Sequence, residues 1–463
     1  MKKRSFHIKN FGCQMNKLDS SLVASALRDN NWTQSKRLED CDAVIINTCS
    51  VRARAEEKAL SAIGRIRHIK KTKPSLTVAV IGCMAQRMGA ELLAGSIVDI
   101  VCGPAQIPQM PKLLAKTIET KTQNIATAEK IRSKPTQNQR DILDDFERTY
   151  DSDTDNIPSQ AFVRVMFGCN NMCSYCIVPY VRGPEISRPP QTIIEQIKKL
   201  AGSGVKLVTL LGQTVNSYEY KAGGKTNCLA DLLEMASEVD GIEWIRFVTS
   251  YPSEKYFDRI CNAMATLPKV CPYLHIPAQS GSDKILKAMN RRYTASQYLD
   301  LLGRAREAVP NIAIAGDFIV GFPGETDEDF NATAELLKAA EYKNCFIFKY
   351  SPRPGTEGHK QLTDDVPMEI KKQRNIELLA VQEQISGPLS EKFLDRTVRV
   401  LVEGLSKKPH LNQSENQSHP QLVSRTADDW IVVFNGPESL TGQFANIKIT
   451  KTAPLTLFGQ LEQ

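Results

Sequence analysis

The stretch from Gly168 to Pro189 reads GCNNMCSYCIVPYVRGPEISRP and places Cys169, Cys173 and Cys176 within eight positions. Three thiols on one loop that also holds Gly and Asn do not form the repeating pattern of a buried core face. Structural zinc takes four ligands, usually two Cys pairs or a Cys pair with a His pair, and the chain has six histidines and no second CxxC motif. A cubane of four irons and four sulfides is normally held by four thiolates, so three would leave one iron open to a substrate or cofactor.

From this loop onward, strand-like and helix-like segments alternate along the chain. Six such repeats are too few for a complete eight-stranded barrel and too regular for an open sheet with a switch point. We therefore predict a domain of the α/β class over residues 155–388, built as an incomplete parallel barrel of six βα units. Its predicted strands are 162–168, 206–212, 244–250, 273–279, 312–321 and 345–351.

Polar residues follow several of these strands at the point where each strand ends. In parallel α/β folds, the carboxyl ends of the strands carry the ligand-binding residues. Any single polar loop residue can simply be solvated, but together these residues indicate one open binding face. They are Gln213, Asn216, Ser250, Gln279, Ser280 and Arg353.

Residues 3–120 show a second alternation of apolar runs and helical segments, which predicts a small open parallel sheet of flavodoxin-like or Rossmann-like type. Cys13, Cys49 and Cys83 each come just after one of its strands, so this fold would bring three thiols to one edge of the sheet. The helices that follow would stabilise thiolates with their N-termini. The predicted strands are 5–12, 43–48, 76–82 and 97–103.

Two further segments complete the predicted organisation. Residues 121–154 are polar and lack apolar runs, which is typical of a linker along the outside of neighbouring domains. Residues 389–455 contain short β-rich runs separated by Gly, Pro and Asn, which predict a small antiparallel barrel of a kind that often holds nucleic acid. Within it, the polar insertion 406–420 is expected to be a partly disordered loop. The predicted strands are 396–404, 430–436 and 443–454.

Composition narrows the function classes. No apolar h-region follows the basic first residues and no apolar run approaches the roughly 18 residues of a membrane span, so we expect a cytoplasmic protein with no membrane partner. In that compartment the 12 cysteines would stay mostly reduced, which favours metal ligation or thiol chemistry over disulfides. The net charge of +7 permits a polyanionic partner, and Arg291 and Arg292 in MNRRY are candidates for phosphate contacts.

The run CNNMCSYC resembles the signature of the radical S-adenosylmethionine (SAM) superfamily. In that superfamily the amino and carboxylate groups of SAM chelate the open iron of a [4Fe–4S] cluster, and SAM is cleaved to methionine and a 5′-deoxyadenosyl radical. The resemblance implies that Cys169, Cys173 and Cys176 hold this cluster and that Tyr175 lies near the adenine. The strand-end residues that it implies as SAM contacts are Gln213, Asn216, Ser250 and Gln279.

Two three-cysteine sites followed by a β-barrel resemble the methylthiotransferases in domain order, over nearly the whole chain. Within that family NTCSVRARAEEK (47–58), HIPAQSGSDKILKAMNRRYT (275–294) and YSPRPGT (350–356) are most similar to the members that act on isopentenylated adenosine. The C-terminal region is similar to the TRAM module that binds RNA, although Ser424 stands where a glycine is expected.

This resemblance implies a tRNA-modifying enzyme that replaces the C2 hydrogen of N6-isopentenyladenosine, next to the anticodon, by a methylthio group. A second [4Fe–4S] cluster on Cys13, Cys49 and Cys83 would hold the sulfur, one SAM would supply the methyl group and another the radical. Radical chemistry fits the task because an aromatic C–H bond is strong and carries no acidic proton. A single-stranded loop lets the base be splayed out and read. An electron donor such as flavodoxin or ferredoxin is also implied.

Two alternatives stay open. Close relatives in the same family put methylthio groups on threonylcarbamoyl-adenosine or on a ribosomal-protein aspartate. From a different class, the chain could be a non-catalytic RNA-binding or electron-transfer iron–sulfur protein, which predicts closed clusters with four ligands and no SAM cleavage. The count of three plus three cysteines opposes the second alternative.

Overall fold

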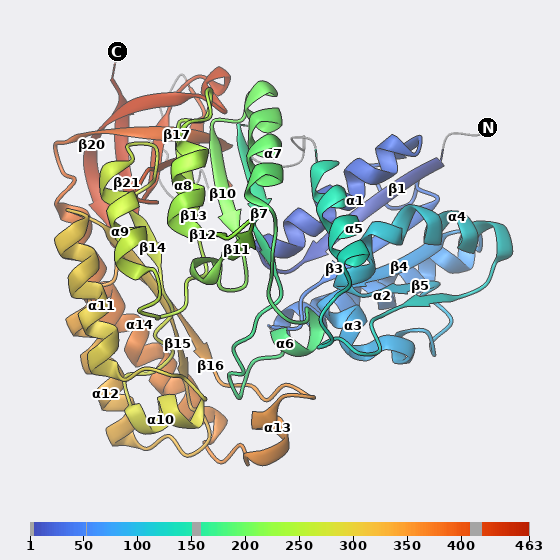
Figure 1. Ribbon diagram of the computed structural model, residues 1–463, viewed down its shortest axis with the longest axis horizontal. Coiled ribbons are helices and arrows are strands. Elements are labelled where there is room, and N and C mark those ends of the chain that lie inside the picture. Colours follow the sequence, from blue (N-terminus) through green and yellow to red (C-terminus); the bar gives the residue numbers. More distant parts are fainter. Residues whose placement is uncertain (1–3, 52, 151–158, 408–418, 463) are drawn as a thin grey trace.

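The computed structural model describes residues 4–51, 53–150, 159–407 and 419–462, and Figure 1 shows three units along the chain. A parallel-sheet domain lies beside a partial barrel, and a small β-barrel lies at one end of that partial barrel. The predicted α/β class and the predicted C-terminal barrel are both confirmed. Most of the polar insertion predicted at 406–420 lies outside the described residues.

The N-terminal sheet has six parallel strands, which are, in spatial order, β2 (Trp32–Gln34), β1 (Arg4–Phe11), β3 (Ala43–Thr48), β4 (Thr77–Gly82), β5 (Ile100–Cys102) and β6 (Asn124–Ala126). Strands β3 and β4 are buried along their whole length because helices cover both faces of the sheet. One face carries α1 (Gln14–Asp29) and α4 (Met110–Thr120), and the other carries α2 (Ala53–Thr72) and α3 (Cys83–Met88). The four predicted strands are confirmed; β2 and β6 are three-residue edge strands, too short for a detectable period.

The partial barrel has six strands in two parallel sheets, β7 (Gln160–Arg164), β10 (Leu207–Leu211) and β13 (Trp244–Phe247), then β14 (Tyr273–His275), β15 (Ala313–Val320) and β16 (Asn344–Lys349). Hydrogen bonds join the two sheets, since the Ser250 N–H donates to the His275 carbonyl at 3.1 Å. All six predicted strands are confirmed. The long helices of this unit are α7 (Pro190–Gly202), α8 (Leu229–Ser237), α9 (Phe257–Thr266), α11 (Ala295–Ala308), α12 (Asp327–Ala340) and α14 (Met368–Glu391).

Shorter elements lie at the carboxyl ends of the barrel strands and between the domains. Helix α5 (Gln137–Arg148) falls in the segment 121–154, and its N-terminus is capped by the Thr136 hydroxyl. The remaining elements are β8 (Met166–Phe167), α6 (Val178–Val181), β9 (Ile186–Ser187), β11 (Glu219–Ala222), β12 (Lys225–Cys228), α10 (Asp283–Ala288) and α13 (Glu357–Gln361).

The C-terminal unit is a closed five-stranded barrel with β17 (Thr397–Leu405), β18 (Gln421–Thr426), β19 (Ile431–Asn435), β21 (Thr456–Leu461) and β20 (Phe444–Ala453) in spatial order. The three predicted strands are confirmed, while β18 and β21 escape the sequence pattern. In β21, Gly459 interrupts the apolar alternation. A larger residue does not fit at this position, because a Cβ there would lie 2.4 Å from the Lys448 carbonyl oxygen. Ser424 is buried and donates its hydroxyl hydrogen bond to Val432 O at 2.9 Å, so the barrel accommodates a serine here.

The small barrel docks on the amino ends of the partial-barrel strands through a buried charge cluster. The Asp429 carboxylate, on the turn between β18 and β19, accepts from Arg246 at 2.9 Å and from Arg425 at 3.2 Å, and lies 3.5 Å from Lys343. Beside this cluster the Trp244 and Phe444 rings meet edge to face with centroids 4.7 Å apart. The opposite end of the partial barrel, which holds α6, α10 and α13, is therefore left open for other groups (Figure 1).

Replacing Asp429 by alanine is expected to lower the free energy of unfolding by about 3 kcal/mol, because it leaves three cations near a buried site without their carboxylate. Burial raises the pKa of Asp429, but Arg246, Lys343 and Arg425 outweigh it and hold the pKa below its usual value. The stabilisation is thus present above about pH 4 and is lost as the pH falls through the lower folded pKa. Denaturant unfolding followed by tryptophan fluorescence at several pH values measures both effects, with the exposed Glu438→Ala as control; equal stability of the two variants would contradict the prediction.

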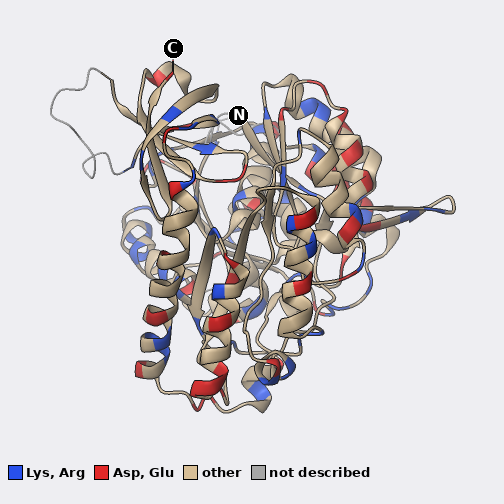
Figure 2. Cartoon of the chain, turned by 90° about the vertical axis from the view of Figure 1, so that its left-hand side faces the viewer, with Lys and Arg blue, Asp and Glu red and all other residues tan. Residues whose placement is uncertain are grey.

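Charged residues of both signs are interspersed along the helices on the side of the molecule drawn in Figure 2. Among the described residues, no helix has the length and the apolar content needed to cross a membrane.

Candidate active site

The first set of three thiols lies on the loop between β8 and α6, at the open end of the partial barrel. This loop folds back on residues that follow it, because the Cys169 N–H donates to the Gly183 carbonyl at 3.0 Å. Gly168 makes the turn with φ of +64°, and a Cβ there would lie 2.0 Å from the Pro184 carbonyl oxygen. The Cys176 N–H donates to the Cys173 carbonyl at 3.0 Å, which holds the last two thiols on one turn.

Two of the three thiols, Cys169 and Cys176, have a raised pKa. Burial, assisted by the neighbouring Glu185 and Cys173, raises the pKa of Cys169 to about 11. Burial raises the pKa of Cys176 as well, again with contributions from Cys173 and Cys169. Clustered, buried thiols of this kind become thiolates when a metal supplies positive charge, so the donor set suits an iron–sulfur cluster.

Arg291 contacts this set from the β14–α11 connection. Its Nη1 lies 3.4 Å from the Cys173 sulfur, its Nη2 donates to Pro277 O at 3.0 Å, and its guanidinium lies 4.5 Å from the centroid of the Tyr251 ring. Of the two arginines expected to contact phosphate, Arg291 thus faces a thiol, while Arg292 is exposed. Phosphate contacts from these two arginines stay a prediction, and the Arg291 side chain is already engaged inside the protein.

The five residues predicted to contact SAM differ in how free their side chains are. Tyr175 packs beside Tyr350 next to the thiol loop. The Ser250 hydroxyl is buried and has no hydrogen-bond partner among the described residues. Buried polar groups are normally hydrogen-bonded, so this hydroxyl is available to bind a polar ligand. Asn216 donates to Tyr251 O at 2.7 Å and accepts from Tyr251 N at 2.8 Å, so both ends of its amide clamp two strand-end loops together.

Gln279 and Gln213 complete this set at the strand ends. Gln279 is buried and adopts φ of +71°, a left-handed conformation that is uncommon for a residue other than glycine and is concentrated at functional sites. Thr249, at the end of β13, has the same φ of +71°. Gln213 is half-buried after β10. SAM contacts from these residues stay a prediction.

The second set of thiols lies at the carboxyl edge of the N-terminal sheet, where the sequence placed it. Cys13 caps the N-terminus of α1, Cys49 follows β3, and Cys83 begins α3. The Cys49 thiol donates a hydrogen bond to the Cys13 sulfur, and Cys83 is close enough to influence the pKa of Cys49. The structure therefore brings together three thiols that are more than thirty residues apart in the sequence.

The three thiols of this second set differ in the direction of their pKa shifts. The hydrogen bond from Cys49 lowers the pKa of Cys13 to about 6, with burial opposing and Arg182 assisting. The same bond and burial raise the pKa of Cys49 well above its usual value. Burial also raises the pKa of Cys83, against the lowering influence of Arg182. The three pKa values are thus shifted in different directions, with that of Cys13 lowered and those of Cys49 and Cys83 raised.

Gly82 shapes the turn that presents Cys83. It adopts φ of +93°, and a Cβ there would lie 2.6 Å from the Asn47 side-chain oxygen and 2.8 Å from the Thr48 carbonyl oxygen. Gly82→Ala is expected to destabilise the N-terminal domain by about 2 kcal/mol, measured from the midpoint of denaturant unfolding. The matched control is Gly64→Ala in α2, where nothing lies within 4 Å and alanine is expected to stabilise by about 0.5 to 1 kcal/mol. Equal midpoints for the two variants would contradict this account of Gly82.

The two sets of thiols are joined by one short helix. Ile177 and Val181, at the two ends of α6, pack against Cys83 in one buried cluster. Because Ile177 directly follows Cys176, a residue next to the first set contacts a residue of the second. From the other side of the barrel, Arg353 after β16 donates to the Val51 carbonyl at 3.1 Å, two residues beyond Cys49. The second set therefore faces the open end of the barrel.

Within the described part of the chain, no three His, Cys, Asp or Glu side chains converge as the ligands of a single metal ion do.

Sequence reasoning missed Arg182, Asp19 and Arg164, which meet in one buried network beside the second set. Arg182 lies six residues after Cys176, so its position in the motif region was the one available signal. Asp19 lies on α1 and carries no such signal, since only the fold brings it to the barrel.

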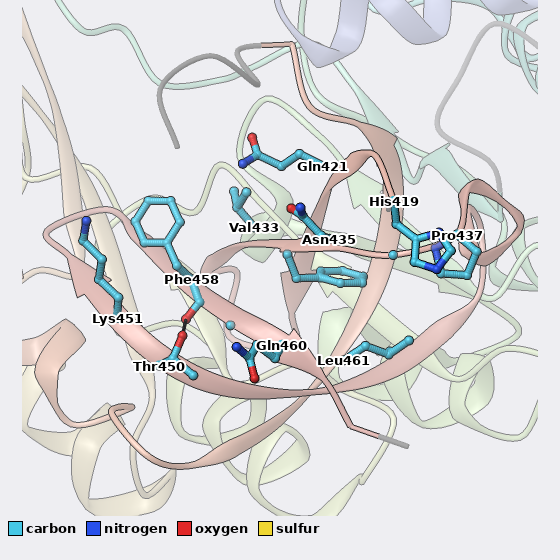
Figure 3. A pocket seen from close by; sticks show the side chains of 13 residues that line it. His419, Gln421, Val433, Asn435, Pro437, Thr450, Lys451, Phe458, Gln460 and Leu461 are labelled. Carbon is cyan, nitrogen blue, oxygen red and sulfur yellow. Dashed lines mark hydrogen bonds between the residues drawn. The ribbon is translucent and has the colours of Figure 1, made fainter. Parts of the chain in front are cut away.

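The C-terminal barrel carries a groove of about 490 Å³ on its outer surface. Figure 3 shows Phe458 and Lys451 together at one side of it, with Gln460 and Asn435 nearby. The Lys451 ammonium lies 5.7 Å from the centroid of the Phe458 ring. An aromatic face, an ammonium group and amides are the groups with which proteins bind single-stranded nucleic acid.

Three protein families match consecutive parts of the chain. They are Uncharacterized protein family UPF0004 over residues 5–103, the Radical SAM superfamily over residues 163–337 and the TRAM domain over residues 392–461. Solved structures support the fold. Radical SAM methyltransferase TsrM from Kitasatospora setae, with cobalamin and a [4Fe-4S] cluster bound, is similar with a TM-score of 0.53 and 14% identity, covering 77% of each chain. At that identity the likeness concerns the fold alone.

Curated proteins are similar to the chain from end to end. The tRNA-2-methylthio-N(6)-dimethylallyladenosine synthase of Rhodopirellula baltica is 40% identical over 460 residues, which cover 99% of this chain and 96% of the relative. The protein of the same name from Syntrophomonas wolfei is 40% identical and covers 98% of this chain and 97% of its own. The one from Polynucleobacter asymbioticus is 39% identical and covers 99% and 98%. The chain therefore belongs to the tRNA-2-methylthio-N(6)-dimethylallyladenosine synthase family of radical SAM enzymes.

Proposed function

We propose that this protein adds a methylthio group to C2 of N6-isopentenyladenosine next to the anticodon of tRNA, forming 2-methylthio-N6-isopentenyladenosine. The observation that carries the proposal is the contact between the two thiol sets, because Cys83 packs against the helix that directly follows Cys176. A radical generated beside one set would then arise close to sulfur held by the other. Family membership and the TRAM region support tRNA as the substrate.

The donor sets fit two [4Fe–4S] clusters, one on Cys169, Cys173 and Cys176 and one on the N-terminal thiols. When bound, such clusters and SAM supply an electron, an open iron and the methyl and radical chemistry that an aromatic C–H bond demands. The buried Ser250 hydroxyl, which has no hydrogen-bond partner in the described part of the chain, fits a polar ligand beside the first set. The remaining proposed SAM contacts are Tyr175, Gln213, Asn216 and Gln279.

The chain's own residues position and shield these groups. Asn216 fixes the loops after β10 and β13 through Tyr251, and Arg291 ties the Cys173 sulfur to the β14 loop. Cys169, Cys173, Cys49 and Cys83 are buried, which keeps water away from reactive intermediates. Cys13 and Cys176 are half-buried and lie nearest to solvent.

Partners follow from this chemistry. The isopentenylated anticodon loop is single-stranded, so its target base can be splayed out without opening a helix. The groove around Phe458 and Lys451 is suited to hold further nucleotides. Each turnover needs a low-potential electron, for which we propose flavodoxin or ferredoxin as donor. A tRNA substrate supports a cytoplasmic location.

The test is anaerobic incubation of reconstituted protein with reductant, SAM and isopentenylated tRNA, followed by mass spectrometry of the digested nucleosides. A methylthio mass increase on isopentenyladenosine is expected. 5′-Deoxyadenosine without that product, together with an increase on threonylcarbamoyl-adenosine or on a ribosomal-protein aspartate, would move the protein to another substrate. Absence of both products from protein that holds iron would favour a non-catalytic iron–sulfur RNA-binding protein.

A further inference from the structure

We propose that Phe346 and Phe348, on the inner face of the partial barrel, bind the isopentenylated adenine, and that Asp317 beside them disfavours bases with an acidic substituent. The inference rests on the proposed function, because it takes isopentenyladenosine in tRNA as the substrate. It deepens that function by naming the side chains that recognise this base.

The two phenylalanines lie on the face of β16 that carries no helix. Cys345 faces α14, since its thiol donates to Gln382 Oε1 at 2.7 Å, and Ile347 packs in a cluster with the same helix. Successive side chains of a strand point to opposite faces of the sheet. Phe346 and Phe348 therefore point to the inner face of the partial barrel.

This pair forms an aromatic surface that is accessible from outside the protein. The two rings are nearly parallel, with an angle of 16° between their planes and centroids 6.4 Å apart. Of all aromatic side chains in the described part of the chain, that of Phe346 is the most exposed, at 50%. Burial of so large an apolar side chain normally stabilises a fold, so its exposure on an inner strand needs a reason. Single-stranded RNA supplies one, because its unstacked bases stack on aromatic side chains.

The pair is aligned along the strand with the first set of thiols. The same alternation continues from Phe346 and Phe348 to Tyr350, which packs in one cluster with Tyr175, the residue before Cys176. At about 3.3 Å per residue, Phe348 and Phe346 lie about 7 and 13 Å along the chain from Tyr350. A base bound on this pair is therefore held below the open end of the barrel, on the side of the first thiol set.

A carboxylate next to the pair adds selectivity between the two kinds of modified adenosine. Asp317 on β15 is the register partner of Phe346, so it lies on the same inner face. Its Oδ2 lies 3.4 Å from Nε2 of His275 on β14. An isopentenyl group is apolar and uncharged, whereas a threonylcarbamoyl group carries a carboxylate. The aromatic pair favours the first substituent, and like-charge repulsion from Asp317 disfavours the second.

The experiment measures binding of RNA to the full chain by fluorescence anisotropy in the absence of SAM. The probes are anticodon stem-loops that carry isopentenyladenosine, adenosine or threonylcarbamoyl-adenosine at the target position. The isopentenylated RNA is expected to bind most tightly. Phe346→Ala should weaken its binding about tenfold, as the loss of one base–aromatic stack does, and should remove most of the preference over the unmodified RNA. Phe346→Trp, which keeps an aromatic face, should bind within about twofold of the wild type.

Two further variants separate recognition from a general loss of structure. Asp317→Asn should tighten binding of the threonylcarbamoyl RNA by about threefold or more and leave the isopentenylated RNA unchanged. Leu60→Ala removes an apolar side chain of similar exposure, 45%, from α2 in the N-terminal domain and should change none of the affinities. The midpoint of denaturant unfolding should stay close to that of the wild type for Phe346→Ala, because its ring is half in solvent.

The possible outcomes distinguish this inference from the proposed function. Unchanged affinity in Phe346→Ala, or equal weakening for isopentenylated and unmodified RNA, would overturn the inference, while a methylthio product from the wild type would leave the proposed function in place. Conversely, a preference for isopentenylated RNA that depends on Phe346, in protein that holds both clusters but forms no methylthio product, would support the base site and contradict the proposed function.

Discussion

Replacing Cys49 by alanine is expected to abolish methylthiolation while SAM is still cleaved to 5′-deoxyadenosine and methionine. Cys49 lies at the centre of the second set, where its thiol donates to Cys13 and neighbours Cys83, so its loss leaves two ligands for a cluster that needs three. The first set stays intact because none of its residues is changed. Mass spectrometry of nucleosides and quantitation of 5′-deoxyadenosine in the same reaction measure both activities.

Cys41→Ala is the matched control for this variant. Cys41 is buried in the same domain, but it packs in the core behind β3 and hydrogen-bonds the Leu38 carbonyl at 3.0 Å. Both activities should survive this change. Equal loss of methylthiolation and SAM cleavage in Cys49→Ala would mean that the two sets do not divide the chemistry as proposed.

Replacing Cys173 by alanine should remove both activities, because SAM cleavage depends on the first set and methylthiolation depends on SAM cleavage. Cys173 is buried and contacts Arg291, so a thiol from the protein surface cannot reach its position and replace it. The expected result is 5′-deoxyadenosine at the level of the protein-free reaction and no modified nucleoside. Iron content should fall by about half, since the second set still binds its cluster.

Cys271→Ala controls for the loss of a buried thiol in the same unit. Cys271 packs with Leu207 and Trp244 near the amino ends of the barrel strands, far from the open end. Full activity is expected for it. SAM cleavage that persists in Cys173→Ala would show that the radical chemistry does not depend on this loop.

The strands that the sequence predicts and the structure confirms have long apolar runs, and they occur in both parallel domains. Elements such as β2, β6 and β21 escape prediction because three residues or an internal glycine leave too little periodicity. Their place is decided by tertiary pairing, as when Gly459 lets β20 and β21 approach closely.

The thiols could be singled out from sequence because each set has a recognisable setting, a tight loop for one and three strand ends for the other. The groups that act on these thiols could not be singled out from the sequence. Asp19 lies mid-helix, and only the packing of α1 against β7 places it between Arg164 and Arg182. The roles of Asn216 and Ser250 also depend on side-chain partners. The Asn216 amide bonds to Tyr251 through both of its ends, while the Ser250 hydroxyl has no partner within the ranges that the structure describes.

Under the proposed function, two three-thiol sets in contact perform one methylthiolation. The most direct measurement is the nucleoside mass of isopentenylated tRNA after anaerobic reaction with wild-type protein, Cys49→Ala and Cys173→Ala, each with 5′-deoxyadenosine counted. Both products are expected from the wild type, 5′-deoxyadenosine alone from Cys49→Ala and neither from Cys173→Ala. A methylthio product from Cys49→Ala, or none from wild-type protein that holds two clusters and cleaves SAM, would contradict the proposed function.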